Sequence, residues 1–224
     1  MSLPPVQQFG SHTVAQILGR STDVDACIAL VTQINQLLDQ ASVRLQEAGS
    51  RLACQAGCNF CCHLRVLLLP HEAIALFRYL QSRMPVAAAT QVRAKLREYT
   101  HPAPAPGPAS PTPAGPATPR PCAFLVNGEC AAYEVRPAAC AAYHSLSKER
   151  CELSYRDPAV PSGTVALQAL RVVAVAMQEG VSTGVAAQGL SNLPLELHTA
   201  VAALLDDPAL IARWRAGRPL LKSP

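Results

Sequence analysis

Apolar residues recur most regularly between residues 23 and 48. The steps alternate between three and four residues, which is the spacing of one face of an α-helix. The positions of this stripe are Val24, Cys27, Val31, Ile34, Leu38, Ala41 and Leu45. Thr22 or Asp23 can cap the start of this helix, and Gly49 can close its end. Because Cys27 belongs to the stripe, we interpret it as a core residue and not as a ligand.

Two more helices are expected in the middle of the chain. A short apolar run after Arg65 leads into a helix in which Pro70 takes the first position and Glu72 suits the first turn. His71 is interpreted as an exposed residue of that turn. After the break at Met84-Pro85, the pattern predicts a second amphipathic helix over residues 86–100.

The C-terminal part also shows helical patterns. One runs from Ser162 to Met177 and ends at Gly180, and a loop leads from there to an apolar helical segment at residues 195–205. A last helix is expected where Asp207 caps, Pro208 opens and Gly217 stops the pattern "DDPALIARWRAG". Runs of β-branched residues are few and short. The patterns therefore predict a mainly α, irregular helical domain.

Composition refines this picture. Half of the 224 residues are hydrophobic, but aromatics make up only 4% and alanine is frequent, so the helices should be thin and approach one another closely. A chain of this length can bury a core without disulfides or metals. The net charge of +4 is spread along the chain without a basic block, so nucleic-acid binding is not indicated.

The expected cellular compartment is inferred from the lack of a signal region and of a membrane-spanning tract in the sequence. The N-terminal residues show neither a basic nor an apolar signal region, and no apolar tract reaches the roughly 18 residues needed to span a bilayer. We therefore expect a cytoplasmic protein that does not bind membranes. Thiols stay reduced in that compartment, which makes clustered cysteines more typical of metal ligands or catalytic groups than of disulfides.

Residues 101–121 form a distinct Pro/Ala-rich insert. They hold nine of the chain's 20 prolines, and no helix or strand ladder tolerates that density. The insert is interpreted as a solvated spacer or an expanded loop. The alternative is a ligand for a proline-binding module.

The stretch "CQAGCNFCCH" at residues 54–63 places four cysteines in nine positions. Cys58 and Cys61 have the two-residue gap that turns two sulfurs toward one ion, and Cys54 lies one helical turn before Cys58. Adjacent side chains in an extended chain point apart, so Cys61 and Cys62 should not readily chelate the same ion. One of the two then serves a second metal, bridges two metals or stays a reactive thiol.

A second group of cysteines follows the insert. Its members are Cys122, Cys130, Cys140 and Cys151. Together with the first group they make eight thiols, enough for two four-thiolate sites or for one iron-sulfur cluster with thiols to spare. A thiol-disulfide switch built on the adjacent pair of the first group is a third alternative.

Polar neighbours of the second group can tune such a centre. Arg136 either stabilises the negative thiolates or forms a salt bridge with Glu134 or another carboxylate. Tyr133 either donates a hydrogen bond to a sulfur or is a packing aromatic. Three histidines complete the candidates.

Of these histidines, His63 and His144 can each replace a thiol as ligand, because each follows a cysteine closely. His198 lies in an aliphatic helix and is interpreted as a satisfied residue. A helix that begins at Pro137 is expected to direct its N–H groups toward Cys140.

The motifs "CNFCC" and "CAAYEVRPAAC" carry a family resemblance. The pattern C-x3-C-x2-CC, followed by C-x7-C-x2-Y-x2-RP-x2-C and a later cysteine, resembles the YkgJ family of cysteine-cluster proteins with the zinc- or iron-chelating CxxCxxCC domain. The resemblance covers about residues 54–151, and the Pro/Ala-rich insert departs from the compact pattern. It implies one metal centre formed by both cysteine groups.

A related cysteine module occurs in flagellin lysine methylases, where an iron-sulfur centre accompanies methyl transfer. No region of this chain is assignable to a methyl-donor site, so that activity is not carried over and enzymatic activity stays open. We expect a helical region at residues 1–53, a metal-chelating domain at 54–151 and C-terminal helices at 152–224 that pack on it. The expected function is zinc or iron binding; the alternative is an iron-sulfur redox or accessory protein that assists modification of a partner protein.

Overall fold

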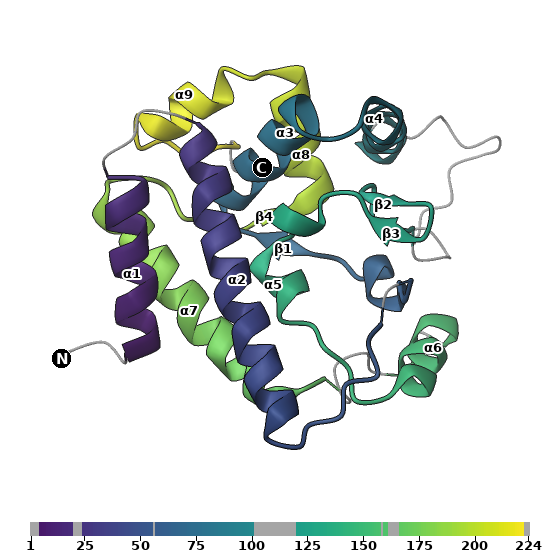
Figure 1. Ribbon diagram of the computed structural model, residues 1–224. Helices are drawn as coiled ribbons and strands as arrows, with labels where there is room; N and C mark the ends of the chain where they lie inside the picture. Colours follow the sequence, from purple (N-terminus) through teal and green to yellow (C-terminus); the bar gives the residue numbers. More distant parts are fainter. Residues whose placement is uncertain are drawn as a thin grey trace.

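The computed structural model describes residues 5–19, 24–55, 57–100, 120–157, 159–160 and 166–221. The described chain is helical, with two antiparallel pairs of two-residue strands (Figure 1). The prediction of a mainly α, irregular fold is confirmed. The expected caps Thr22 and Asp23, and residues 101–119 of the insert, lie outside the described residues.

Helix α2 (Asp25–Glu47) follows the most regular stripe of the sequence. Its apolar face is buried along most of its length, and Cys27 is fully buried in the core as expected. Gly49 ends the helix with φ +100°, a left-handed conformation that favours glycine. α2 is the long central helix of Figure 1. It contacts four other helices: α1 (Pro5–Ile17), α3 (Pro70–Ser82), α5 (Ala138–Ala141) and α7 (Gln168–Ala187).

Helices α1 (Pro5–Ile17) and α7 (Gln168–Ala187) pack side by side. The expectation that the helix ends at Gly180 is wrong, because α7 continues for two further turns. A Cβ added at Gly180 would overlap the Gln7 carbonyl oxygen, and one at Gly184 would lie 2.8 Å from the Val14 Cβ. Close approach of α1 therefore stabilises a helix that glycine weakens by about 1 kcal/mol per residue.

Helix α3 (Pro70–Ser82) begins at Pro70 as predicted and lies between α2 and α8 (Leu197–Asp206). Its first two turns are buried all round, so it is not amphipathic there. The expected exposure of His71 is wrong, since the side chain is 1% exposed. Burial lowers the pKa of His71 to about 3, so the imidazole is neutral at physiological pH.

Helices α4 (Val86–Thr100), α8 and α9 (Leu210–Arg215) lie near α3 at one end of the fold (Figure 1). α4 packs against α8, and α8 follows the strand pair of β1 (Leu67–Leu68) with β4 (Leu195–Glu196). The last helix, α9, begins two residues after the predicted position. Asp207 caps the preceding turn by accepting the Ala209 N–H at 3.0 Å.

Alanine substitutions test the contact between α1 and α7. Alanine normally favours a helix over glycine, but here we expect Gly180→Ala and Gly184→Ala each to lower the free energy of unfolding by about 1–3 kcal/mol, because the added methyl overlaps α1. Chemical denaturation measures the change. The control Val175→Ala, at an exposed position of α7, should stay within about 0.5 kcal/mol of the parent. Stabilisation by either glycine substitution would contradict the close packing.

Candidate metal centre

The described part of the first cysteine group, residues 54–55 and 57–63, contains a turn followed by a short 3-10 helix. The Cys58 N–H donates to the Gln55 carbonyl at 3.0 Å, and Gly57 takes φ +80° beside it. The expectation that Cys54 lies one helical turn from Cys58 is therefore wrong in its geometry. The turn leads directly into η1 (Phe60–His63), which carries the adjacent cysteines.

The two adjacent thiols interact with each other. Cys61 and Cys62 lie on η1 and not on the extended chain that was expected to separate them. A hydrogen bond to Cys62 raises the pKa of the Cys61 thiol, and burial raises it further. Both sulfurs therefore occupy the same region, and either can face an ion there.

The four cysteines of the second group come from four different segments. Cys122 precedes β2 (Leu125–Val126), Cys130 ends β3 (Glu129–Cys130), Cys140 lies in α5 (Ala138–Ala141) and Cys151 in α6 (Lys148–Arg156). In Figure 1 these elements surround η1 on the same side of the molecule.

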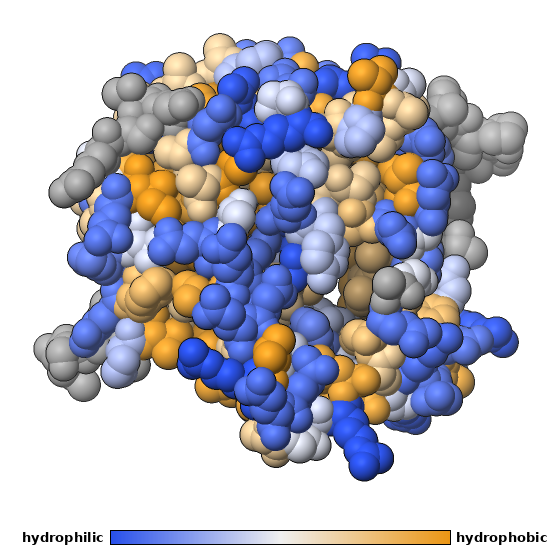
Figure 2. Space-filling view, viewed as in Figure 1, coloured by the Kyte–Doolittle hydropathy of each residue, from blue (hydrophilic) through white to orange (hydrophobic). Residues whose placement is uncertain are grey.

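The two cysteine groups lie against each other in the fold. The Cys122 N–H donates to the Cys62 carbonyl at 2.6 Å, and the Ala53 N–H donates to the Ser145 carbonyl at 2.8 Å. A hollow in the molecular surface lies where Figure 1 shows α5, the β2–β3 pair and η1 (Figure 2). The fold thus brings together two segments that the insert separates in the sequence.

Charge interactions divide the thiols into two sets. We call Cys54, Cys58 and Cys151 the outer thiols and Cys122, Cys130 and Cys140 the inner thiols. Cys54 is exposed as a residue, but partial desolvation of its thiol raises its pKa, and the charges of the other outer thiols and of Cys61 add to this. Burial also raises the pKa of Cys140, with added contributions from the other inner thiols and again from Cys61. Cys61 is thus the thiol that interacts with both sets.

Backbone N–H groups already point at several sulfurs. The Ser145 N–H donates to the Cys54 Sγ at 3.1 Å. Hydrogen bonds from the backbone of Phe124 and Ala132 lower the pKa of Cys122 and Cys130, although burial outweighs them and raises the pKa of Cys122 to about 12. Such bonds stabilise a thiolate and are typical of the surroundings of metal-bound cysteine.

The donor chemistry suits a thiolate-bound metal, but the sulfurs are not yet in ligand positions. Among the described residues, no three His, Cys, Asp or Glu side chains are arranged to hold an ion. No disulfide joins any of the eight clustered cysteines, all of which are described. Zn–S bonds of about 2.3 Å require sulfurs about 3.8 Å apart, so metal binding would draw the thiols together. Zinc and iron both accept this donor set.

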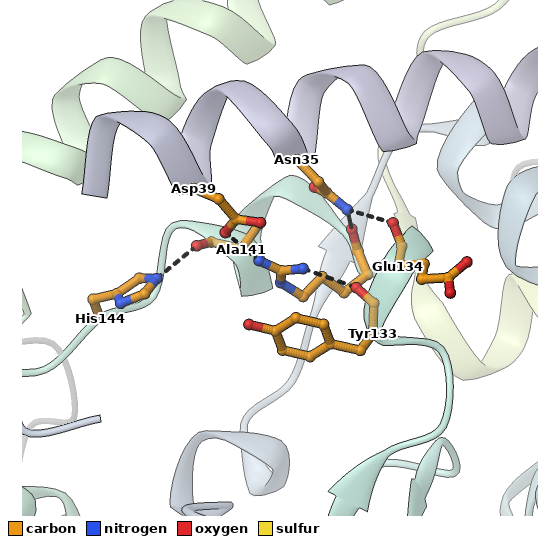
Figure 3. A network of polar contacts seen from close by, with 7 residues as sticks. Asn35, Asp39, Tyr133, Glu134, Ala141 and His144 are labelled. Carbon is orange, nitrogen blue, oxygen red and sulfur yellow. Dashed lines mark hydrogen bonds and ion pairs between the residues drawn. The ribbon is translucent and has the colours of Figure 1, made fainter. Parts of the chain in front are cut away.

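Arg136 connects the second cysteine group to α2. Its guanidinium forms a salt bridge with Asp39 and donates to the Tyr133 carbonyl at 2.8 Å (Figure 3). The alternative partner Glu134 is not used. Arg136 also opposes the burial of Cys130 by lowering the pKa of that thiol. Arg136 is therefore a salt-bridge partner of a carboxylate other than Glu134, and its charge also acts on the Cys130 thiol.

Two more side chains of this network fix the backbone. Asn35 of α2 donates to the carbonyls of Glu134 and Arg136 at 3.2 and 2.9 Å (Figure 3). The Tyr133 ring lies under the guanidinium, 3.9 Å from ring centre to Cζ, and is 58% exposed. Its position matches the packing alternative.

Like Asn35 and Asp39, Glu72 supports this region in a way that the sequence did not reveal. It is buried, and its carboxylate accepts the Leu69 N–H at 2.7 Å and the Ala138 N–H at 2.8 Å. The helix expected from Pro137 begins at Ala138, and its first N–H points at Glu72 and not at a thiol. Glu72 thereby holds the segment that ends in Cys140. The sequence signal was a glutamate in the third helical position. Such a glutamate is expected to accept the Leu69 N–H, but it does not predict the bond from Ala138.

The segment that enters Cys122 is held by α4 and α8. The Tyr99 hydroxyl donates to the Pro121 carbonyl at 2.8 Å, and the Ala123 N–H donates to His198 Nε2 at 3.1 Å. The other ring nitrogen of His198 lies 3.1 Å from Glu196 Oε1. His198 is satisfied on both sides, as expected. Pro121, the last residue of the Pro/Ala-rich insert, is consequently tied to α4, the helix that precedes the insert in the sequence.

A small cavity of about 50 Å³ separates η1 from α6. Cys61 and Cys151 line it together with His63, whose ring lies 4.5 Å from that of Tyr155. His144 is placed differently, with Nε2 3.1 Å from the Ala141 carbonyl oxygen and a buried Nδ1 that makes no hydrogen bond. His63 is thus the histidine that shares a cavity with thiols.

Residues 53–157 match the family model CxxCxxCC, described as "Putative zinc- or iron-chelating domain". The match begins before Cys54 and ends after Cys151, so it spans both cysteine groups. Neither the curated proteins nor the solved structures contain a match to this chain. Within the described residues, no helix has the length and apolar character needed to cross a membrane. This part of the chain is therefore similar to a zinc- or iron-chelating domain.

Removing most of the Pro/Ala-rich insert tests whether the residues on either side of it are enough to keep the two cysteine groups together. Because Tyr99 and Pro121 are hydrogen-bonded, the few residues left after deletion of 103–118 can still span the gap. The deletion changes the free-energy cost of closing this loop by only about a few tenths of a kcal/mol. We expect the melting temperature and metal content to match those of the parent, measured by calorimetry and elemental analysis. Loss of metal would mean that the insert positions the two cysteine groups.

Replacing Glu72 tests its role as a brace. Glu72→Ala leaves two buried N–H groups without an acceptor, so we expect it to lower the free energy of unfolding by about 2–4 kcal/mol. The matched control is Glu98→Ala, an exposed glutamate on α4, which should change it by less than about 0.5 kcal/mol. Denaturant titrations compare them. Equal effects of the two substitutions would refute the brace.

Proposed function

We propose that this chain is a metal-binding protein that chelates zinc or iron through its two cysteine groups. The ligands are Cys54, Cys58, Cys61, Cys62, Cys122, Cys130, Cys140 and Cys151. The observation that carries the proposal is the contact between the groups, in which Cys122 donates to the Cys62 carbonyl and Cys61 interacts with both sets of thiols. The family match over residues 53–157 supports the same function.

Electrostatics favours a cation at this place. Burial raises the pKa of Cys54, Cys122, Cys130 and Cys140, and the negative charges of neighbouring thiols add to the rise because like charges repel. A divalent ion replaces the protons and compensates the thiolate charge. Structural zinc sites contribute on the order of 10 kcal/mol at neutral pH, far more than closing the loop that contains the insert costs.

Polar groups around the cysteines also stabilise the negative charge of the thiolates. Arg136 and the N–H donors to the sulfurs stabilise thiolates, and Arg136 is held in place by Asp39. We infer that Tyr133 keeps the guanidinium oriented and has no direct bond to a sulfur. The metal-chelating domain proposed here is residues 54–151, flanked by helices at 1–53 and 152–224, in a cytoplasmic protein.

The identity of the centre separates two functional classes. Zinc would make it a structural or metal-handling centre. An iron-sulfur cluster would favour a redox or accessory protein that assists modification of a partner protein. The cavity beside the centre, about 50 Å³, has room for a few water-sized groups and not for a large organic cofactor.

Anaerobic purification followed by metal and sulfide analysis decides between the classes. We expect metal bound in proportion to protein. About two zinc ions without sulfide and a colourless solution would remove the iron-sulfur alternative. Broad absorption near 400 nm that bleaches on reduction, together with acid-labile sulfide, would remove the zinc one. Protein that is folded and binds neither metal would refute the proposed function.

Single substitutions test whether both groups form one centre. Cys58→Ser and Cys140→Ser should each lower the metal content and the melting temperature, because each removes a ligand from a different group. Cys27→Ser is the control and should spare the metal, since Cys27 lies in the core formed by α2. Full metal content in the Cys140 variant would show that the second group is not part of the centre.

A further inference from the structure

The two sets of thiols are attached to parts of the fold that differ in how firmly they are held. Each inner thiol adjoins a segment tied to packed helices. Tyr99 and His198 hold the chain at Cys122, and Glu72 holds the chain before Cys140. Cys130 pairs across the strands with Leu125, whose carbonyl accepts a hydrogen bond from Lys95 of α4. The helices that supply these bonds, α3, α4 and α8, pack on one another and carry core residues. The inner thiols are therefore fixed to the core.

The outer thiols lie on a thinner part of the structure. Cys54 is exposed, and Cys151 belongs to α6. Neither α6 nor η1 contains a fully buried residue, and the extensive contacts of α6 are with η1 alone. Segments with few buried contacts open locally at a low free-energy cost. The outer thiols can consequently separate without unfolding of the core.

A cavity gives access to the centre at the same place. The space of about 50 Å³ between η1 and α6 is lined by Cys61 and Cys151, and its other lining residues include His63, Tyr143 and Tyr155. This volume admits water-sized groups. An ion held by the outer thiols would thus have a side from which an entering ligand can reach it, as open metal sites do and closed structural sites do not.

The adjacent cysteines of η1 link the two sets. Cys61 lines the cavity together with the outer thiol Cys151, and the Cys62 carbonyl accepts the N–H of the inner Cys122 at 2.6 Å. Each set has three thiols, and a four-thiolate site requires one more sulfur per set. The adjacent pair supplies one sulfur to each.

We propose that the chain holds two thiophilic divalent cations of different lability: an exchangeable ion at the outer thiols and a retained ion at the inner thiols, with Cys61 and Cys62 completing the two sites. This inference rests on the proposed function, because it divides the same eight ligands between two ions. The outer ion is then a cargo that the protein can receive or release, and the inner ion stabilises the fold.

Chelator kinetics test the division. The full-length chain is loaded anaerobically with Zn(II) to saturation and mixed with excess EDTA, and zinc release is followed with a chromogenic indicator. We expect two phases of about equal amplitude, with the fast rate at least about tenfold above the slow one, because opening of α6 removes Cys151 from the outer ion while the three inner thiols stay attached to the core. A single phase from protein that binds two zinc ions overturns the division and leaves the proposed function intact.

Substitutions assign the phases. Cys54→Ser removes an exposed outer thiol and should abolish or accelerate the fast phase while the slow phase keeps its rate and amplitude. Cys130→Ser should remove the slow amplitude, and Cys27→Ser should leave both phases unchanged. Should Cys54→Ser alter the slow phase as much as the fast one, the sets are one site and the inference is wrong. Failure of the wild-type chain to bind zinc or iron at all would instead refute the proposed function and this inference with it.

Discussion

Hydrogen bonds to the backbone of residues 133–138 are the constraint on which the second cysteine group depends. Asn35 and Asp39 reach this segment from α2, and Glu72 reaches it from α3. The segment has little regular secondary structure, and buried backbone groups there need partners. Asn35 and Glu72 supply them directly, and Asp39 holds the Arg136 side chain that donates to the Tyr133 carbonyl, so the direction of the chain between Cys130 and Cys140 is set by the helical core. A cysteine-rich loop thereby acquires defined positions without disulfides.

The firm part of the molecule is made by close helix packing. Gly180 and Gly184 let α7 lie against the backbone of α1, and α3 is enclosed by its neighbours. The cysteine-bearing segments η1 and α6 lie outside this packing and contact each other. The inner thiols therefore adjoin the packed helices, whereas Cys151 lies on a helix without buried residues.

Part of the fold was predictable because the pattern is local. The stripe of α2 and the burial of Cys27 follow from spacing and size, and Pro70 and Gly49 mark helix ends through their own backbone preferences. Other features depend on distant partners. The pattern did not predict α1, and the end of α7 was placed too early, because glycine is a poor helix former until another backbone lies where its side chain would be. His71 was expected at the surface because nothing nearby shows that α2 and α8 enclose α3.

The sequence by itself determined the chemistry of the candidate site: eight thiols in two groups, their spacing, and a metal preference for zinc or iron. It also determined the helical class of the fold, because the spacing of apolar residues that predicts a helix is a local pattern of three to four residues. Only the tertiary structure decided which thiols face one another, that Cys61 lies between two sets, and that Asp39 and Glu72 support them. The reason is that such contacts join residues dozens of positions apart, and their geometry depends on how the helices pack and not on any local pattern.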